Sequence, residues 1–249
     1  MYFNDVHILI YIAFAIIGAI VGFFIGWCNE RLPKYEKIFS KEIIHKYKTT
    51  LKPNYILMII NAIIYIVLLY IFGLHENITN NINLIKYMVL LPMLLSVFVI
   101  DYKLQIIPNR LNLTMFEIGL IFAFLNGMTQ NMFFVTDALL GMLAGGGIFL
   151  LLTLIGGLIA GKEAMGFGDV KFMGALGLFF GLTNIIVISI LSFLIAAIVS
   201  IALMIIKKKK KSDYIPFGPF IVLSAFVVTF IPSHILLFIL GKILTLGML

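Results

Sequence analysis

Long apolar runs recur along the whole of this chain, and they constrain its fold more than any other feature. Each run is close to the ~20 residues that a helix needs to cross the hydrocarbon core of a bilayer. The strands of an outer-membrane barrel would instead alternate apolar and polar residues over shorter segments. With 62% hydrophobic and 12% charged residues, the chain also has too few polar side chains to coat a soluble globule. We therefore predict an all-α, polytopic membrane helical bundle that forms a single domain over residues 1–249.

The apolar runs predict about eight transmembrane helices, separated by stretches rich in Pro, Asn and charged residues. The expected spans are residues 8–27, 54–74, 84–101, 111–127, 135–158, 169–182, 185–206 and 216–231. A last apolar stretch, 235–249, either extends the eighth helix or lies in the membrane interface. The first run lacks a basic amino-terminal region and an A-x-A cleavage site, so we interpret it as a retained helix.

The basic residues predict the orientation of the chain. With the N-terminus outside, 16 of the 18 Lys and Arg residues fall in inner loops, and only Lys86 and Lys242 remain outside. Cytoplasmic loops of membrane proteins carry such an excess of basic residues. This orientation makes residues 28–53 the first cytoplasmic loop. The net charge of +7 then indicates loops beside anionic membrane lipid rather than a nucleic-acid partner.

Two carboxylates stand out because they lie at the inner ends of predicted spans. Asp101 ends the third span, in SVFVIDYKLQIIPNRLN, and Asp169 begins the sixth, directly after Gly166 and Gly168. A carboxylate at the bilayer is costly, so it usually serves a function or has a partner. The two glycines leave room for an approaching backbone and allow positive φ in the turn.

Two such carboxylates on one membrane face suggest an aspartic dyad that shares a proton. One would act as general base on a water molecule, and the other would polarise an amide carbonyl. The residues alone leave two other possibilities open. The acids could belong to a proton- or ion-coupled transporter, or they could pair with Lys103 and Lys171 in a structural subunit of a membrane assembly.

The residues GFGDVK, 166–171, resemble the G-x-G-D motif of intramembrane aspartyl proteases. Asp101 with Pro108 and Asn109, IPFGPF at 215–220 and GFFIGWCNERLP at 22–33 narrow this likeness. Together they are similar to the bacterial type IV prepilin peptidases, also called leader peptidases. Archaeal preflagellin peptidases are close relatives and remain an alternative.

The resemblance implies that Asp101 and Asp169 form the catalytic pair. They would cleave the leader of type IV prepilin or pseudopilin precursors at the cytoplasmic face of the bacterial inner membrane. No cofactor is implied for proteolysis, whereas the family's second activity, N-methylation of the new N-terminus, uses S-adenosylmethionine. Many members bind zinc through two C-x-x-C pairs in the first loop. This chain has only Cys28, so we expect a short form without a metal site.

The remaining candidates would shape the site or contact substrate. They are Gly166, Gly168, Lys171, Pro108, Asn109, Pro216, Gly218, Pro219, Asn29, Arg31 and Glu163. The glycines at 145–147 lie within an apolar span, where they predict close helix packing rather than cofactor contact. Asp137 is expected to be an interfacial charge, and Glu117, inside the fourth span, has no assigned role.

Overall fold

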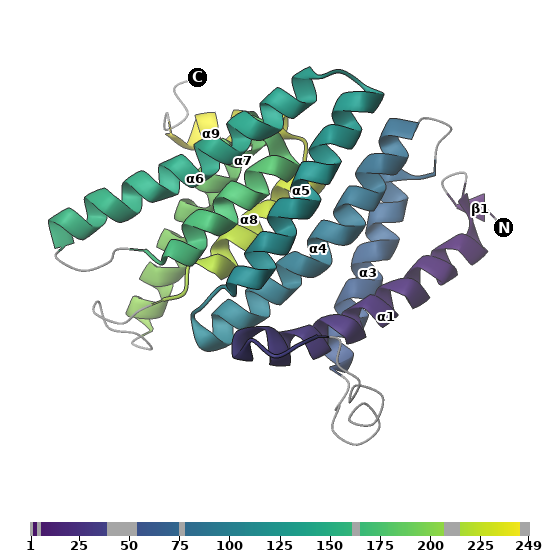
Figure 1. The fold of residues 1–249 in the computed structure, drawn as a ribbon, viewed down its shortest axis with the longest axis horizontal. Coiled ribbons are helices and arrows are strands. Elements are labelled where there is room, and N and C mark those ends of the chain that lie inside the picture. Colours follow the sequence, from purple (N-terminus) through teal and green to yellow (C-terminus); the bar gives the residue numbers. More distant parts are fainter. Residues whose placement is uncertain are drawn as a thin grey trace. The chain divides into compact units, whose positions relative to one another are not determined.

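The structure, a computed structural model, describes residues 2–3, 6–38, 54–74, 78–160, 165–206 and 215–244. These residues are almost entirely helical (Figure 1). They group into two compact units, Met1–Ile100 and Asp101–Leu249. The all-α membrane bundle predicted from the sequence is confirmed, apart from a hairpin of two short strands at the N-terminus.

The first unit contains the hairpin and three helices. Strands β1 (Tyr2–Phe3) and β2 (Val6–His7) pair antiparallel ahead of α1 (Ile8–Arg31), which ends in the short 3-10 helix η1 (Leu32–Lys34). Helix α3 (Tyr55–Phe72) follows, and α4 (Ile78–Leu104) runs to the boundary of the second unit. The predicted first loop, 28–53, therefore begins later than expected, because residues 28–31 continue α1. Residues 39–53 lie outside the described residues.

Helices α1 and α3 pack closely because two glycines of α1 face α3. A Cβ atom at Gly18 would lie 2.8 Å from Ala62 Cα, and one at Gly22 would lie 2.6 Å from Leu57 O. Small residues four apart let membrane helices approach in this way. The buried Asn61 adds a hydrogen bond from Nδ2 to Gly18 O, 2.7 Å long.

The second unit contains α5 (Asn109–Thr129), α6 (Phe133–Ala160), α7 (Phe167–Ile205), α8 (Gly218–Phe230) and α9 (Ser233–Leu244). Helix α7 packs against each of the others. Helix α9 is bent by 119° from α8, so it does not extend that helix. Of the two alternatives for the last apolar stretch, the extended eighth helix is therefore wrong.

Helix α7 reverses direction at Gly181, where φ is 74° and ψ is 179°. A Cβ atom at Gly145 of α6 would lie 2.6 Å from Met173 O and 2.8 Å from Ile185 Cγ1. Met173 and Ile185 are twelve residues apart, so in a straight helix they would lie about 18 Å apart along the axis. They could not then both lie next to Gly145. The chain therefore folds back, and two arms of α7 lie against α6. Gly145 confirms the predicted close packing, as does Gly146, whereas Gly147 has nothing within 4 Å.

The reversal explains why fewer long helices are found than predicted. By length and composition, six described helices can cross a membrane, or seven if α8 and α9 form one bent span. The prediction was about eight. The sixth and seventh predicted spans, 169–182 and 185–206, are both contained in α7, and Gly181 divides them.

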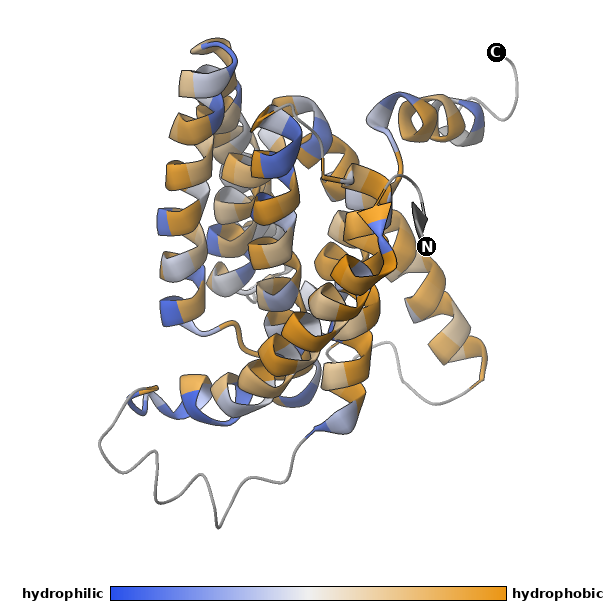
Figure 2. Ribbon diagram, turned by 90° about the vertical axis from the view of Figure 1, so that its right-hand side faces the viewer, coloured by the Kyte–Doolittle hydropathy of each residue, from blue (hydrophilic) through white to orange (hydrophobic). Residues whose placement is uncertain are grey.

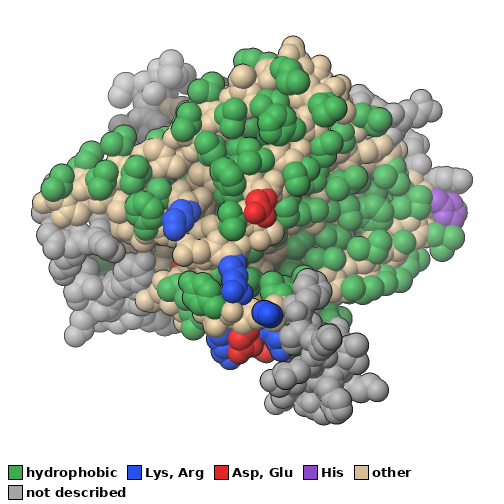
Figure 3. Space-filling view, viewed as in Figure 1, with side chains coloured by type: hydrophobic (Ala, Val, Ile, Leu, Met, Phe, Trp, Pro, Cys, Tyr) green, Lys and Arg blue, Asp and Glu red, His purple; other side chains and the backbone are tan. Residues whose placement is uncertain are grey.

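The surface of the chain is apolar, as a lipid environment requires. Most helical ribbon is coloured as hydrophobic in Figure 2. On the face drawn in Figure 3, hydrophobic side chains predominate and charged ones are few. Large apolar side chains such as Leu143, Ile121 and Ile198 are more than half exposed. Such a surface identifies a multi-pass membrane protein.

Candidate functional site

Asp101 lies in the last turn of α4 and is only 4% exposed. Its Oδ2 accepts a hydrogen bond of 2.9 Å from the backbone N–H of Gly218. Gly218 is the first residue of α8, where N–H groups have no partner within the helix and the helix dipole favours negative charge. Gly218, one of the predicted site residues, therefore orients the Asp101 carboxylate.

A side chain at position 218 would not fit beside Asp101. A Cβ atom there would lie 2.5 Å from Asp101 Oδ2 and 3.0 Å from Asp101 Cγ. The neighbouring Pro219 occupies the first turn of α8, where its missing N–H is not needed, and it is buried. Pro216 is half-buried just before the helix. The IPFGPF segment therefore brings a helix N-terminus against Asp101.

Asp169 lies in the first turn of α7 and is 5% exposed. Its carboxylate is close enough to that of Asp101 for the two to interact electrostatically. The Oδ1 atom of Asp169 is buried and has no hydrogen-bond partner among the described residues. A buried acceptor without a partner is rare in folded proteins, so this oxygen is open to a donor such as a water molecule or a substrate amide.

Gly166 and Gly168 leave space for neighbouring side chains and do not adopt unusual backbone angles. Gly166 has a φ of −68°, and neither glycine has positive φ. The expectation of positive φ in this turn is therefore wrong. A Cβ atom at Gly166 would lie 3.4 Å from Asp169 Oδ2, and one at Gly168 would lie 3.4 Å from Ile107 Cβ. Both glycines allow neighbouring groups to approach the first turn of α7.

The IPN segment contacts the same turn from α5. Buried Pro108 is the N-cap residue of this helix, and Asn109 Oδ1 accepts a 3.0 Å hydrogen bond from Lys171 Nζ. Asn112, one turn later, donates from Nδ2 to Gly168 O at 3.2 Å. Asn112 was not predicted from the sequence. The signal that would have found it is a second Asn three residues after Asn109, on the same face of the helix.

Lys103 and Lys171, which one alternative paired with the two carboxylates, form no such ion pairs in the part of the chain that the structure describes. Lys171 binds Asn109 instead, and the side chain of Lys103 is exposed. An ion pair in the described part of the chain joins Arg31 and Glu36 instead, with 4.0 Å between Nε and Oε2. This arrangement disfavours the reading of Asp101 and Asp169 as a structural ion-pair network.

Asn29 and Arg31 belong to the first unit, at the end of α1. The Arg31 guanidinium lies 3.8 Å from the centre of the Trp27 ring, and Nη1 donates to Lys37 O at 2.9 Å. Both polar side-chain atoms of Asn29 are buried without a hydrogen-bond partner among the described residues. Asn29 and Arg31 therefore stay predictions as substrate contacts, since they belong to the first unit and the carboxylates belong to the second. Glu163 lies outside the described residues.

Two other acidic residues, Asp137 and Glu117, lie in the second unit. Asp137, predicted as an interfacial charge, is half-buried in α6 and accepts a 3.2 Å hydrogen bond at Oδ1 from the N–H of Leu182. It thereby caps the second arm of α7 where the chain reverses. Glu117 is exposed on α5.

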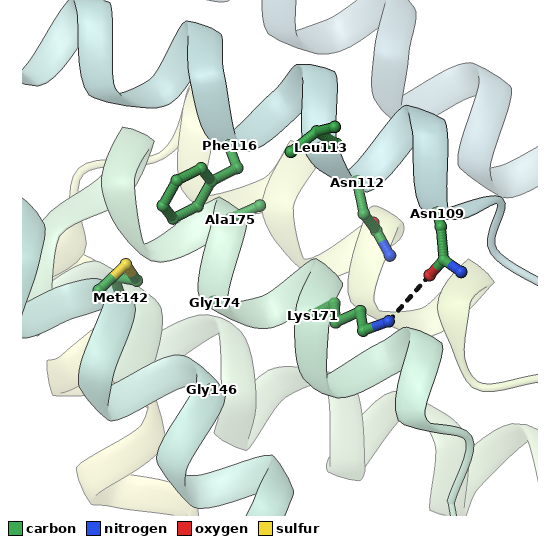
Figure 4. A pocket seen from close by; sticks show the side chains of 9 residues that line it. All are labelled: Asn109, Asn112, Leu113, Phe116, Met142, Gly146, Lys171, Gly174 and Ala175. Carbon is green, nitrogen blue, oxygen red and sulfur yellow. Dashed lines mark hydrogen bonds between the residues drawn. The ribbon is translucent and has the colours of Figure 1, made fainter.

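A pocket of about 560 Å³ lies between α5, α6 and α7. Neither Asp101 nor Asp169 lines it. Figure 4 shows the polar side chains of Asn109, Asn112 and Lys171 at one end, with Phe116 and Met142 toward the other. Among the described residues, no group of three His, Cys, Asp or Glu side chains could hold a metal ion, and Cys28 is buried.

Comparison with known proteins agrees with this geometry. Residues 88–201, which include both carboxylates, match the type IV leader peptidase family. The chain is 31% identical over 134 residues to a prepilin leader peptidase/N-methyltransferase of Aeromonas hydrophila, a match that covers 54% of this chain and 45% of the relative. A protein of the same name from Legionella pneumophila is 33% identical over 140 residues, covering 55% and 46%. A third, from Neisseria gonorrhoeae, is 30% identical over 141 residues, covering 57% and 46%.

The matched region thus spans slightly less than half of each of these relatives. No solved structure matches the chain.

Proposed function

We propose that this chain, whose residues 88–201 belong to the type IV leader peptidase family, is a membrane aspartyl endopeptidase. Its substrates would be type IV prepilin or pseudopilin precursors, which it would cut between the leader and the hydrophobic segment. The observation that carries the proposal is the pair of buried, electrostatically interacting carboxylates at the end of α4 and the start of α7. We place the enzyme in the bacterial cytoplasmic membrane, with this pair near the cytoplasmic face.

The chemistry follows from two carboxyl groups that share one proton. The ionised group takes a proton from a water molecule as the water oxygen bonds to the scissile carbonyl carbon. The protonated group gives its proton to the carbonyl oxygen, which becomes a hydroxyl of the tetrahedral intermediate. The C–N bond then breaks as this group takes a proton back from one of the two hydroxyls, and the proton taken from water passes from the other group to the leaving amine. No metal ion is needed for these steps.

Each carboxylate has a fixed place in this scheme. The Gly218 N–H holds Asp101 at Oδ2, which leaves its other oxygen for water or substrate. Asp169 Oδ1, which has no partner, is available to hydrogen-bond a water molecule or the substrate amide. The glycines at 166 and 168 leave space for an extended peptide beside the first turn of α7. These contacts support a peptidase more directly than an ion-coupled transporter, for which no described feature argues.

The test is cleavage of a purified prepilin by the purified chain in detergent. Wild type should release the leader, and Asp101→Asn and Asp169→Asn should each lower kcat by at least about 10³-fold. The double variant should be no worse than either single variant, because the two groups act as one unit. If either single variant cuts at the wild-type rate, the dyad is not the catalytic site. A proton or ion flux lost in Asp101→Asn, with no cleavage by wild type, would favour the transporter.

N-methylation of the new N-terminus is suggested by the names of the relatives alone. The pocket between α5, α6 and α7 does not fit S-adenosylmethionine, because no carboxylate of the described residues lines it to bind the ribose hydroxyls or the amino group. The first loop lies largely outside the described residues. Methylation can be tested in the same assay, by measuring the transfer of a labelled methyl group from S-adenosylmethionine to the cleaved pilin.

A further inference from the structure

The pocket between α5, α6 and α7 lies on a different side of α7 from the catalytic pair. Asp169 and Lys171 are two residues apart, which places their side chains about 200° apart around the helix axis. Asp169 is buried, whereas Lys171 is exposed and lines the pocket. The pocket therefore opens on another side of α7 from the one that carries Asp169.

Most of the pocket is lined by apolar residues, as a site for an acyl chain would be. Leu113, Phe116, Met142 and Ala175 present apolar side chains, and Gly146 and Gly174 present none. The three helices that form it are each long and apolar enough to cross a membrane. A lipid acyl chain that enters between these helices would remain in an apolar environment. The volume, about 560 Å³, lies within the roughly 300–1,000 Å³ of ligand pockets.

One end of the pocket is polar and chemically specific. It contains the Lys171 ammonium and the Asn109 amide, joined by their hydrogen bond (Figure 4). Next to them is Asn112, which is 4% exposed, with its Oδ1 buried and unpaired among the described residues. Because the Asn112 nitrogen donates to Gly168 O, its oxygen must be the free atom. This end therefore offers a cation and also lacks one hydrogen-bond donor, which a ligand must supply to avoid the cost of a buried unpaired acceptor.

We infer that the pocket binds an anionic glycerophospholipid whose headgroup carries a free hydroxyl, as in phosphatidylglycerol. The phosphate accepts from Lys171, a headgroup hydroxyl donates to Asn112 Oδ1, and an acyl chain lies along Phe116 and Met142. The polar residues sit at the first turns of α5 and α7, so the headgroup lies at the helix ends and the chain extends along the helices.

The same chemistry predicts selectivity among lipids. A choline headgroup has no hydrogen-bond donor for Asn112, and an ethanolamine headgroup brings a second cation to Lys171. Glu117, which follows Phe116 in the sequence, is exposed but does not line the pocket, and no carboxylate of the described residues lines the pocket to oppose the phosphate. Phosphatidylglycerol should therefore bind more tightly than phosphatidylcholine with identical acyl chains.

The test is native mass spectrometry of the full chain, delipidated in a nonionic detergent and titrated with each lipid. Wild type should bind one phosphatidylglycerol about tenfold more tightly than phosphatidylcholine. Lys171→Gln and Asn112→Leu should each remove this preference. Lys103→Gln is the matched control, since it removes an exposed lysine of the same unit that does not line the pocket. If Asn112→Leu does not fold, Ala175→Phe fills the pocket and should abolish the single tight site.

Three results would overturn the inference. The first is equal binding of the two lipids by wild type, and the second is an equal loss in Lys103→Gln, which would indicate diffuse charge attraction. The third is a photoreactive prepilin that labels Phe116 or Met142 in the lipid-free protein, since that would assign the pocket to substrate. Lipid binding is measured without cleavage, so it does not depend on the proposed peptidase activity.

Discussion

Replacement of Gly218 by alanine should disable the catalytic pair without unfolding the chain. The added Cβ would lie 2.5 Å from Asp101 Oδ2, 3.0 Å from its Cγ and 3.2 Å from its Cβ. Contacts between a Cβ and another heavy atom are essentially never below 3.0 Å in real structures, so either Asp101 or the start of α8 must move. Overpacking of this kind costs about 1–3 kcal/mol.

The shift also weakens the hydrogen bond that orients the carboxylate. The Gly218 N–H donates to Asp101 Oδ2 at 2.9 Å, and Asp101 is only 4% exposed, so bulk water would replace this donor poorly. A hydrogen bond to a charged group contributes about 1.5–3 kcal/mol. A catalytic group misplaced by about 1 Å can lose about 10²-fold in rate. We therefore expect kcat/KM for prepilin cleavage to fall by about 10²-fold or more.

The matched control is Gly147→Ala, because a Cβ atom at Gly147 meets nothing within 4 Å. It should keep wild-type kcat/KM. Thermal unfolding in the same detergent shows whether each variant is folded. A folded Gly218→Ala enzyme that cleaves at the wild-type rate would refute the role of the α8 N-terminus in orienting Asp101.

Three further predictions follow from contacts in the second unit. Gly141→Ala would place a Cβ 2.5 Å from Gly177 O, so α6 and α7 must separate and the melting temperature should fall, in contrast to the control above. Asp137→Ala removes the acceptor for the Leu182 N–H and should destabilise the chain by about 1 kcal/mol, whereas Asp137→Asn should be nearly neutral; equal unfolding of the two would contradict the capping role. Gly166→Ala places its Cβ 3.4 Å from Asp169 Oδ2, at the edge of ordinary contact, and should therefore lose less activity in the cleavage assay than the α8 variant.

The sequence predicted those features that depend on local pattern. Apolar length located the helices, although α4 begins at Ile78 rather than residue 84, because a polar first turn carries no hydropathy signal. The cost of a carboxylate in a membrane singled out Asp101 and Asp169, and the structure buries both side chains. The helix positions and the choice of each carboxylate depend on local segments, so the sequence alone could suggest them.

Features that depend on two distant segments could not be predicted in the same way. The bond from Gly218 to Asp101 joins residues 117 positions apart, and that from Asn112 to Gly168 joins residues 56 apart. Asp137 looked like a solvated charge because its partner, the Leu182 N–H, exists only where α7 reverses. A backbone donor at a helix start has no signature in the sequence until the helix is placed beside its acceptor.

The reversal at Gly181 also has a consequence for how water reaches the site. The first arm of α7, from Phe167 to Phe180, is only about 20 Å long at 1.5 Å per residue, against a hydrocarbon core of about 30 Å. Nearly all of its residues from Asp169 onward are buried, so protein rather than lipid surrounds the arm. The arm therefore need not reach both surfaces of the bilayer, and Asp169, which begins it, can lie below the surface. Water that serves this carboxylate would then pass between protein side chains rather than through lipid.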